Sequence, residues 1–299
     1  MSSLRTGFEP DPRLYPFRSR FMDTPWGRLH YLDEGTGRPI VLMHGNPTWS
    51  FVFRDLIGPL VAGGFRCIAP DLLGYGLSEH PTNAELGASD HAQVVAELVT
   101  RLDLNDAVVL GQDWGGPIIL GAAVEVAPRI GGVVVGSTFA WRASGFVELV
   151  ARILRTQRVQ RWMVEGETFI ARSMRHLAQR PLSSEELAHY VDVFETPALR
   201  RSLSVLAREL LDAGDWLDTL QARIPETLGH LPALLVFGAR EGALGKRALA
   251  RFARMFSDHV QVRLPTAGHF FQHDAPQEVA AAILERFASA PDRVSARPA

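Results

Sequence analysis

The amino-acid sequence predicts an α/β fold, a mostly parallel sheet flanked by helices on both faces and carrying an inserted helical lid. Apolar strand patterns alternate with helical patterns in the first half of the chain and again near its end, whereas no strand pattern occurs between about residues 140 and 230. The strands are short and almost wholly apolar, as expected for parallel strands buried on both faces. The 299 residues, 46% of them hydrophobic, suffice for one large α/β domain with an insertion.

The elements of the alternating parts follow from apolar runs bounded by glycines, prolines and cap residues. In the first half they predict strands at 27–35, 39–45, 65–70, 107–111 and 131–138, and helices at 50–64, 89–104 and 115–128. Near the end they predict strands at 233–239 and 260–265, a helix at 245–256, and a final helix from about Pro276.

The helical block between these parts is the predicted lid. Residues 144–166 look helical; Ser183 and Glu186 have the spacing of a capping box, and Thr196 and Pro197 fit the N-cap and first position of another helix. We therefore divide the chain into a core domain of residues 1–139 and 231–299 and a cap domain of residues 140–230. If residues 27–35 form the second strand, the lid follows the sixth and covers the carboxyl ends of the strands, where open α/β sheets bind ligands.

Composition narrows the class of protein. The net charge is −2 and no long basic or acidic run occurs, so nucleic-acid and membrane-surface binding have no electrostatic support. The single cysteine, Cys67, lies in an apolar run and is expected to be a buried thiol. We see neither a signal-peptide pattern nor an apolar run of membrane-spanning length, and expect a soluble cytoplasmic protein that needs no cofactor or metal.

The segment Gly111-Gln112-Asp113-Trp114-Gly115 fits the pattern Gly-x-nucleophile-x-Gly between a strand and a helix. In such a nucleophile elbow, the glycines let strand and helix approach while the central side chain is held exposed in a strained conformation. A plain alternative is that Asp113 only caps the following helix, since aspartate is favoured at helix N-termini.

Two further residues complete a candidate triad. His269 is the first histidine after the last predicted strand, in a loop of small residues from which it can reach the elbow as a general base; His273 lies at the start of the final helical region and is the less suitable choice. Glu241, just past the seventh strand, is the best carboxylate to orient His269, although an exposed loop charge is its alternative reading.

These motifs together resemble one family. HGNPTWS at 44–50, GQDWGG at 111–116 and AGHFFQHDAP at 267–276 are similar to the haloalkane dehalogenases, of the subfamily whose triad acid follows the seventh strand. The resemblance covers nearly the whole chain and implies an α/β-hydrolase fold with an eight-stranded sheet. It implies Asp113 as the nucleophile, His269 as the base, and Asn46 and Trp114 as the halide-binding pair. Glu241 stands where that subfamily has aspartate.

The chemistry of these side chains fits the implied activity. A carboxylate suits displacement at a saturated carbon that bears a good leaving group, and attack by Asp113 would leave an alkyl ester on the enzyme. Halide leaves without a proton but needs neutral, fixed donors, which the indole of Trp114 and the amide of Asn46 supply. Their backbone N–H groups can form the oxyanion hole when water activated by His269 attacks the ester. The expected partners are thus a small apolar halogenated substrate, water and halide.

Lid residues carry weaker expectations. Trp141 begins the lid and could donate to the halide or line the pocket, but plain packing is at least as good an interpretation. Phe139 and Phe146 are candidates for an apolar substrate wall, although aromatic residues at helical spacing usually belong to the core.

Other functions remain open. An epoxide hydrolase also uses an aspartate elbow but relies on lid tyrosines, and Tyr190 is the only tyrosine in the lid block. A dehalogenase acting on fluoroacetate is expected to have arginine at the position of Trp114, so the tryptophan argues against this alternative. Two further alternatives are a non-catalytic small-molecule receptor with a hydrolase fold, in which Glu241 would mark the loss of activity, and a cofactor-free oxygenase. For a working enzyme, we expect the extra methylene of Glu241 to slow hydrolysis and Glu241→Asp to speed turnover.

Overall fold

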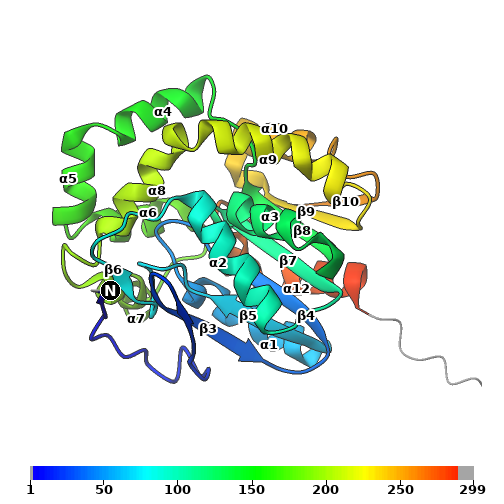
Figure 1. The fold of residues 1–299 in the computed structure, drawn as a ribbon, viewed down its shortest axis with the longest axis horizontal. Coiled ribbons are helices and arrows are strands. Elements are labelled where there is room, and N and C mark those ends of the chain that lie inside the picture. The colour runs from blue at the N-terminus through cyan, green and yellow to red at the C-terminus, as the bar shows by residue number, and fades with distance from the viewer. Residues whose placement is uncertain (1–2, 289–299) are drawn as a thin grey trace, which may run out of the picture.

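The central feature of the computed structural model, which describes residues 3–288, is an eight-stranded sheet (Figure 1). Its strands lie in the order β10-β9-β8-β7-β4-β5-β3-β2 and are parallel except at one edge, where β3 runs antiparallel to both β2 and β5. Their bounds are β2 Arg20–Thr24, β3 Gly27–Glu34, β4 Arg38–Met43, β5 Phe65–Pro70, β7 Ala107–Asp113, β8 Ile130–Thr138, β9 Ala233–Gly238 and β10 His259–Leu264. The predicted fold class is confirmed.

The inner strands form the core because their side chains are apolar on both faces. Strand β9 is buried at every position and β7 at every position before Asp113. Burying such runs between two helical layers supplies most of the favourable free energy of folding. The one strand that we did not assign individually, β2, pairs with β3 across the short turn at 25–26 and is largely exposed.

Two helical layers cover the sheet. On one face, α1 (Arg54–Ala62) packs against α12 (Pro276–Phe287), and α11 (Phe271–Asp274) lies beside both. On the other face, α2 (Ala88–Arg101) and α9 (Gly214–Thr227) pack against α3 (Gly115–Glu125), while α10 (Gly242–Phe252) packs on β8 and β9. Short 3₁₀ turns occupy Ser50–Phe53, Ala127–Arg129, Asp192–Phe194 and Ala239–Glu241, and β1 (Ser3–Leu4) pairs with β6 (His80–Pro81).

The helices between β8 and α9 lie beyond one end of the sheet (Figure 1). They are α4 Phe146–Leu154, α5 Gln157–Glu165, α6 Phe169–Leu177, α7 Ser184–Val191 and α8 Arg201–Asp212. The long helix predicted at 144–166 is in fact two helices, α4 and α5, separated at Arg155 and Thr156. The lid segment assigned from sequence also includes α9, which packs on α3 in the layer that covers the sheet.

Helix caps in the lid were predicted with mixed success. Ser183 and Glu186 form the expected capping box, in which Ser183 Oγ accepts from the Glu186 N–H and the Glu186 carboxylate accepts from the Ser183 N–H. The helix expected to begin at Thr196 instead begins at Arg201. Thr196 closes a separate turn by accepting hydrogen bonds from the N–H groups of Leu199 and Arg200, so its capping capacity is used before the helix starts.

No helix within residues 3–288 is long and apolar enough to cross a lipid bilayer.

Candidate active site

Asp113 occupies a sharp turn between β7 and α3, at the carboxyl edge of the sheet. Its φ of +53° lies in the left-handed region, where a residue other than glycine costs about 1–2 kcal/mol. Thr138 stabilises the turn by donating from Oγ1 to the Asp113 carbonyl at 2.6 Å. The loop after β4 passes so close that a Cβ on Gly45 would lie 2.4 Å from the Asp113 Cβ. The backbone therefore forms an elbow, and a simple capping role does not account for Asp113.

His269 comes from the loop after β10 and faces the elbow. Its Nε2 lies 3.4 Å from Asp113 Oδ2, and its Nδ1 lies 3.4 Å from Glu241 Oε1. Burial alone would lower the pKa of His269, but the hydrogen bonds and negative charges of Asp113 and Glu241 outweigh it and raise this pKa to about 10. The three residues predicted from sequence are thus brought together with the histidine in the middle.

Glu241 is held from both sides. It ends the short 3₁₀ turn that follows β9, and its side chain is largely buried. While Oε1 faces His269, Oε2 accepts a hydrogen bond from Ser137 Oγ at 2.9 Å. Ser137 reaches this position because its backbone, near the end of β8, also adopts a positive φ of 48°. The glutamate is a fixed member of the site and not a loose loop charge.

Gln112 favours the opposite protonation state of the His269 imidazole from the one that the two carboxylates favour. Its fully buried amide nitrogen lies 3.0 Å from His269 Nε2 and donates to the His269 carbonyl at 3.2 Å, while its Oε1 accepts from Gln272 Nε2 at 3.4 Å. Because an amide nitrogen only donates, its contact with Nε2 is a hydrogen bond only when that nitrogen lacks a proton. Gln112 therefore favours the neutral imidazole protonated on Nδ1, whereas the two carboxylates favour the charged form.

Asn46 and Trp114 lie on either side of the nucleophile. The Asn46 backbone N–H donates to Asp113 Oδ1 at 2.9 Å, and its side-chain Nδ2 donates to the carbonyl of Leu203 in the lid at 3.1 Å. The Trp114 indole is 2% exposed and packs edge-on against Phe139 with ring centroids 5.0 Å apart. The indole N–H makes no hydrogen bond to another group of residues 3–288. A second N–H of the Asn46 amide and the indole N–H remain to bind a ligand atom.

The three lid-side aromatic candidates separate into different places. Phe139 lies at the site through its contact with Trp114. Trp141 packs on Phe252, with ring centroids 5.0 Å apart, and the guanidinium of Arg251 lies over its ring. These contacts agree with a packing role for Trp141 and give no support to a role as halide donor. The Phe146 side chain is 65% exposed on α4, so it lines no buried wall in this structure.

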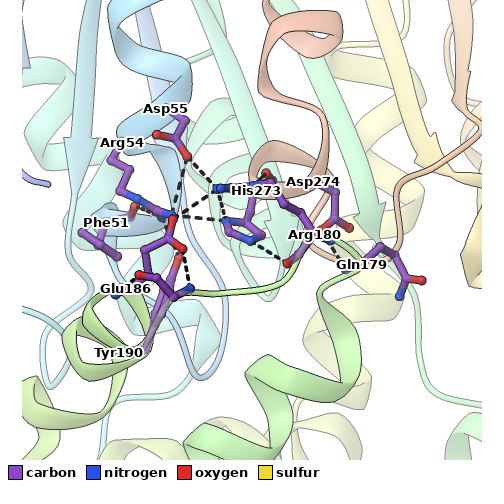
Figure 2. A network of polar contacts seen from close by, with 10 residues as sticks. Phe51, Arg54, Asp55, Gln179, Arg180, Glu186, Tyr190, His273 and Asp274 are labelled. Carbon is purple, nitrogen blue, oxygen red and sulfur yellow. Dashed lines mark hydrogen bonds and ion pairs between the residues drawn. The ribbon is translucent and has the colours of Figure 1, made fainter.

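His273 belongs to a separate polar cluster, between the core and the lid (Figure 2). Its Nδ1 accepts hydrogen bonds from Arg180 at 2.8 Å and Arg54 at 3.3 Å, and burial together with these two charges lowers its pKa. Arg54 and Arg180 also pair with Glu186 and Asp55. Asp55, Glu186 and His273 have ligand atoms close enough to hold a metal ion, but the two guanidinium groups already bind those atoms and would repel a cation.

Sequence reasoning missed the residues that support the triad. Gln112 lies within the motif at 111–116 and Ser137 within the predicted strand at 131–138, yet neither pattern showed that these side chains contact His269 and Glu241. Tyr75, whose hydroxyl donates to the Ser202 carbonyl at 3.0 Å and lies 3.4 Å from Asn46 Oδ1, carried no signal beyond an apolar context.

Comparisons with known proteins agree with this geometry. Residues 38–276 match the family model of the alpha/beta hydrolase fold. Haloalkane dehalogenase 2 of Mycobacterium tuberculosis is 44% identical over 282 residues, which cover 94% of this chain and 98% of the relative. The haloalkane dehalogenase of Sphingobium indicum is 32% identical, over 90% of this chain and 95% of the relative. The crystal structure of a haloalkane dehalogenase from Bradyrhizobium elkani superimposes with a TM-score of 0.79 at 25% identity, covering 90% of this chain and 97% of that one. The chain therefore belongs to the haloalkane dehalogenase family of the α/β-hydrolase fold.

Proposed function

We propose that the protein hydrolyses the carbon–halogen bond of small haloalkanes, giving an alcohol, a halide ion and a proton. This proposal rests on the carboxylate at the elbow and on the indole N–H beside it, which makes no hydrogen bond to another group of residues 3–288. A carboxylate displaces a leaving group from saturated carbon, and neutral N–H donors stabilise the halide that departs. The names of the relatives agree with this reaction.

In the first step an oxygen of Asp113 attacks the carbon that bears the halogen. The new carbon–oxygen bond makes an alkyl ester, and the carbon–halogen electron pair leaves with the halide. Trp114 Nε1–H and an N–H of the Asn46 amide receive the halide. Because Leu203 holds the Asn46 amide in place, the donors are already oriented before charge develops.

In the second step water hydrolyses this ester. Forming the ester removes the negative charge of Asp113, and with it part of the cause that raises the pKa of His269. The imidazole then loses its proton to solvent, a state that the Gln112 amide also favours, and becomes a base. It takes one proton from water, whose oxygen attacks the Asp113 carboxyl carbon. The bond from that carbon to the alkyl oxygen then breaks, the second proton of the water leaves with the alcohol, and Asp113 returns to a carboxylate beside a protonated His269. The base is thus activated by the product of the first step.

Glu241 orients His269 during hydrolysis and stabilises the imidazolium that forms. Its contact with Nδ1 is long, 3.4 Å, but Ser137 fixes the carboxylate so that it faces the ring. A carboxylate at Nδ1 keeps the proton on that nitrogen, so that Nε2 is the basic nitrogen; its lone pair accepts from the Gln112 amide at rest and must be released from that contact to take the proton of water.

We further propose that residues 140–230 act as a cap domain over a core of 1–139 and 231–299, and that the substrate is apolar. The contact of the Asn46 amide with Leu203 of α8 supports a lid that helps to build the site. We place the enzyme in the cytoplasm and expect neither a nucleic-acid nor a membrane partner. The buried thiol of Cys67, whose pKa burial raises to about 12, agrees with a reducing compartment.

The epoxide hydrolase alternative is less well supported by the positions of the tyrosines. Tyr190, the lid tyrosine, is fully buried and its hydroxyl accepts a hydrogen bond from Arg54 at 3.2 Å in the cluster of Figure 2. This hydroxyl is engaged away from Asp113, so it is not placed to donate to an epoxide oxygen.

The decisive experiment is a single turnover with excess enzyme and a bromoalkane in ¹⁸O-labelled water. Because water attacks the carboxyl carbon, the first alcohol should carry unlabelled oxygen from Asp113, and the label should appear in the enzyme. Asp113→Ala should release no bromide, whereas Asp33→Asn, a substitution at a partly buried ion pair with Arg66 on β3, should leave release unchanged. Bromide release by Asp113→Ala, or label in the first alcohol, would refute the covalent mechanism; styrene oxide in the same panel tests the epoxide alternative.

A further inference from the structure

The lid touches the loop that carries His269. Residues 177–180, the end of α6 and the first part of its connection to α7, run beside Gly268, the residue before the histidine. A Cβ on Gly268 would lie 3.0 Å from the side chain of Gln179 and 3.0 Å from the Leu177 carbonyl. The lid segment and the histidine loop are thus packed too closely at this point for a side chain on Gly268 to fit without a small shift.

Asp274 joins these two segments through one carboxylate. Its Oδ1 accepts hydrogen bonds from the lid N–H groups of Gln179 at 2.8 Å and Arg180 at 3.0 Å. Its Oδ2 accepts from the N–H of Gly268 at 2.8 Å. Hydrogen bonds from backbone N–H groups to a carboxylate are short and roughly twice as strong as neutral ones. The carboxylate therefore fixes the Ala267–Gly268 peptide unit, one residue before His269, relative to the lid.

Arg180 and His273 anchor the same junction (Figure 2). Besides its bond to the ring, Arg180 donates from Nε to the His273 carbonyl at 2.9 Å, and His273 Nε2 donates to the Arg180 carbonyl at 3.1 Å. Arg180 also donates a hydrogen bond from Nη2 to Asp55 Oδ2 of α1 at 2.9 Å, so the lid segment is bound to this core helix as well. These contacts hold the lid segment against the core, and Asp274 links the same segment to Gly268.

We propose that Asp274 is a positioning residue that couples the seating of lid residues 177–180 to the orientation of His269. The inference rests on the proposed function, since it assigns Asp274 to the step that uses His269 as a base. Displacing a catalytic group by about 1 Å can slow a reaction by about 100-fold. Only hydrolysis of the ester needs the base, so the coupling acts on the second step and leaves the alkylation step intact.

The kinetic test compares Asp274→Asn with the wild type in rapid-quench experiments on a bromoalkane. Asparagine keeps the size of the side chain but places an N–H₂ group against backbone N–H donors. We expect the initial bromide burst to stay within about twofold and hydrolysis to slow by about 10–100-fold, so that the alkylated enzyme accumulates and is detected by mass spectrometry. Asp33→Asn, at the far end of β3, is the matched control and should change neither step. Burst and hydrolysis falling together, or both unchanged, would overturn the assignment.

A measurement without substrate separates this inference from the proposed function. Amide hydrogen exchange at Gly268 should quicken at least tenfold in Asp274→Asn. It should also quicken in Arg180→Ala, which removes the side chain that anchors the lid segment to His273 and Asp55 but leaves Asp274 and Gly268 themselves unchanged. An unchanged Gly268 amide in Arg180→Ala would refute the coupling whatever the kinetics show. If the wild type releases no halide from any substrate, the proposed function fails, while the exchange result still decides whether the lid and the histidine loop are coupled.

Discussion

Shortening Glu241 by one methylene tests how the triad acid works. From sequence alone, Glu241→Asp was expected to speed turnover by restoring the acid of the related subfamily. The structure reverses the expected sign. The glutamate, at its full length, reaches only to 3.4 Å from His269 Nδ1 while its other oxygen is bound by Ser137. An aspartate at the same backbone position withdraws the carboxylate by about 1.5 Å, the length of one carbon–carbon bond.

The magnitude follows from the change in distance. With an effective dielectric constant of about 20, unit charges at the present separation attract by about 5 kcal/mol, and at about 5 Å by about 3.3 kcal/mol. The loss of about 1.5 kcal/mol of imidazolium stabilisation corresponds to roughly tenfold slower hydrolysis. Glu241→Gln removes the charge and should slow hydrolysis by at least about 100-fold, because the hydrogen bond to Nδ1 becomes neutral.

Quenched-flow measurements with a bromoalkane separate the two steps for each variant. Both variants should retain the bromide burst and lose steady-state rate, with Glu241→Gln slower than Glu241→Asp. Glu125→Asp, at a surface ion pair with Arg223, serves as the control for the same type of substitution. Steady-state turnover of Glu241→Asp equal to or faster than that of the wild type would refute the reasoning from distance.

Three further predictions concern charge and packing. Since the pKa of His269 is raised in the folded state, protonated His269 contributes fully to the free energy of unfolding below about pH 6.5, and this contribution is lost as the pH rises through about 10. Urea unfolding at pH 7 and 10 measures this loss, and Asp113→Asn should make it smaller. Gln112→Leu removes a donor that favours the neutral imidazole, so NMR titration should show the His269 pKa raised further by about one unit, and a lowered pKa would contradict this role. Arg54→Met leaves Glu186 buried without its main partner and should lower the free energy of unfolding by about 3–5 kcal/mol, whereas the double variant with Glu186→Gln should lose less; equal losses would contradict a buried ion pair.

The sheet was predictable because buried parallel strands are continuous apolar runs. Strand β2 was not assigned because it is exposed and its pairing with β3 depends on a turn at 25–26. The helix start at Thr196 was misplaced because a threonine cap can equally close an isolated turn, and only tertiary packing decides which. Long-range context overrode the local signal in both cases.

The candidate triad was predictable because each member follows a strand and the carboxyl ends of parallel strands meet at one edge. The supporting contacts were not, since they depend on conformation and distant pairing. Ser137 needs a positive φ to meet Glu241, and Asp274 meets the lid about 95 residues earlier in the chain. Neither relation leaves a pattern in a single sequence.

The bond between the Asn46 amide and the Leu203 carbonyl has a consequence for the rate at which halide leaves. One side chain spans the base of the site and the lid, so the amide keeps its orientation only while α8 is seated. When α8 moves away, the amide is free to turn and one of the two halide donors is lost at the moment the exit opens. On the proposed mechanism, departure of the ion then depends on the lid as well as on the strength of its own bonds, and the release rates of bromide and iodide should differ less than their affinities.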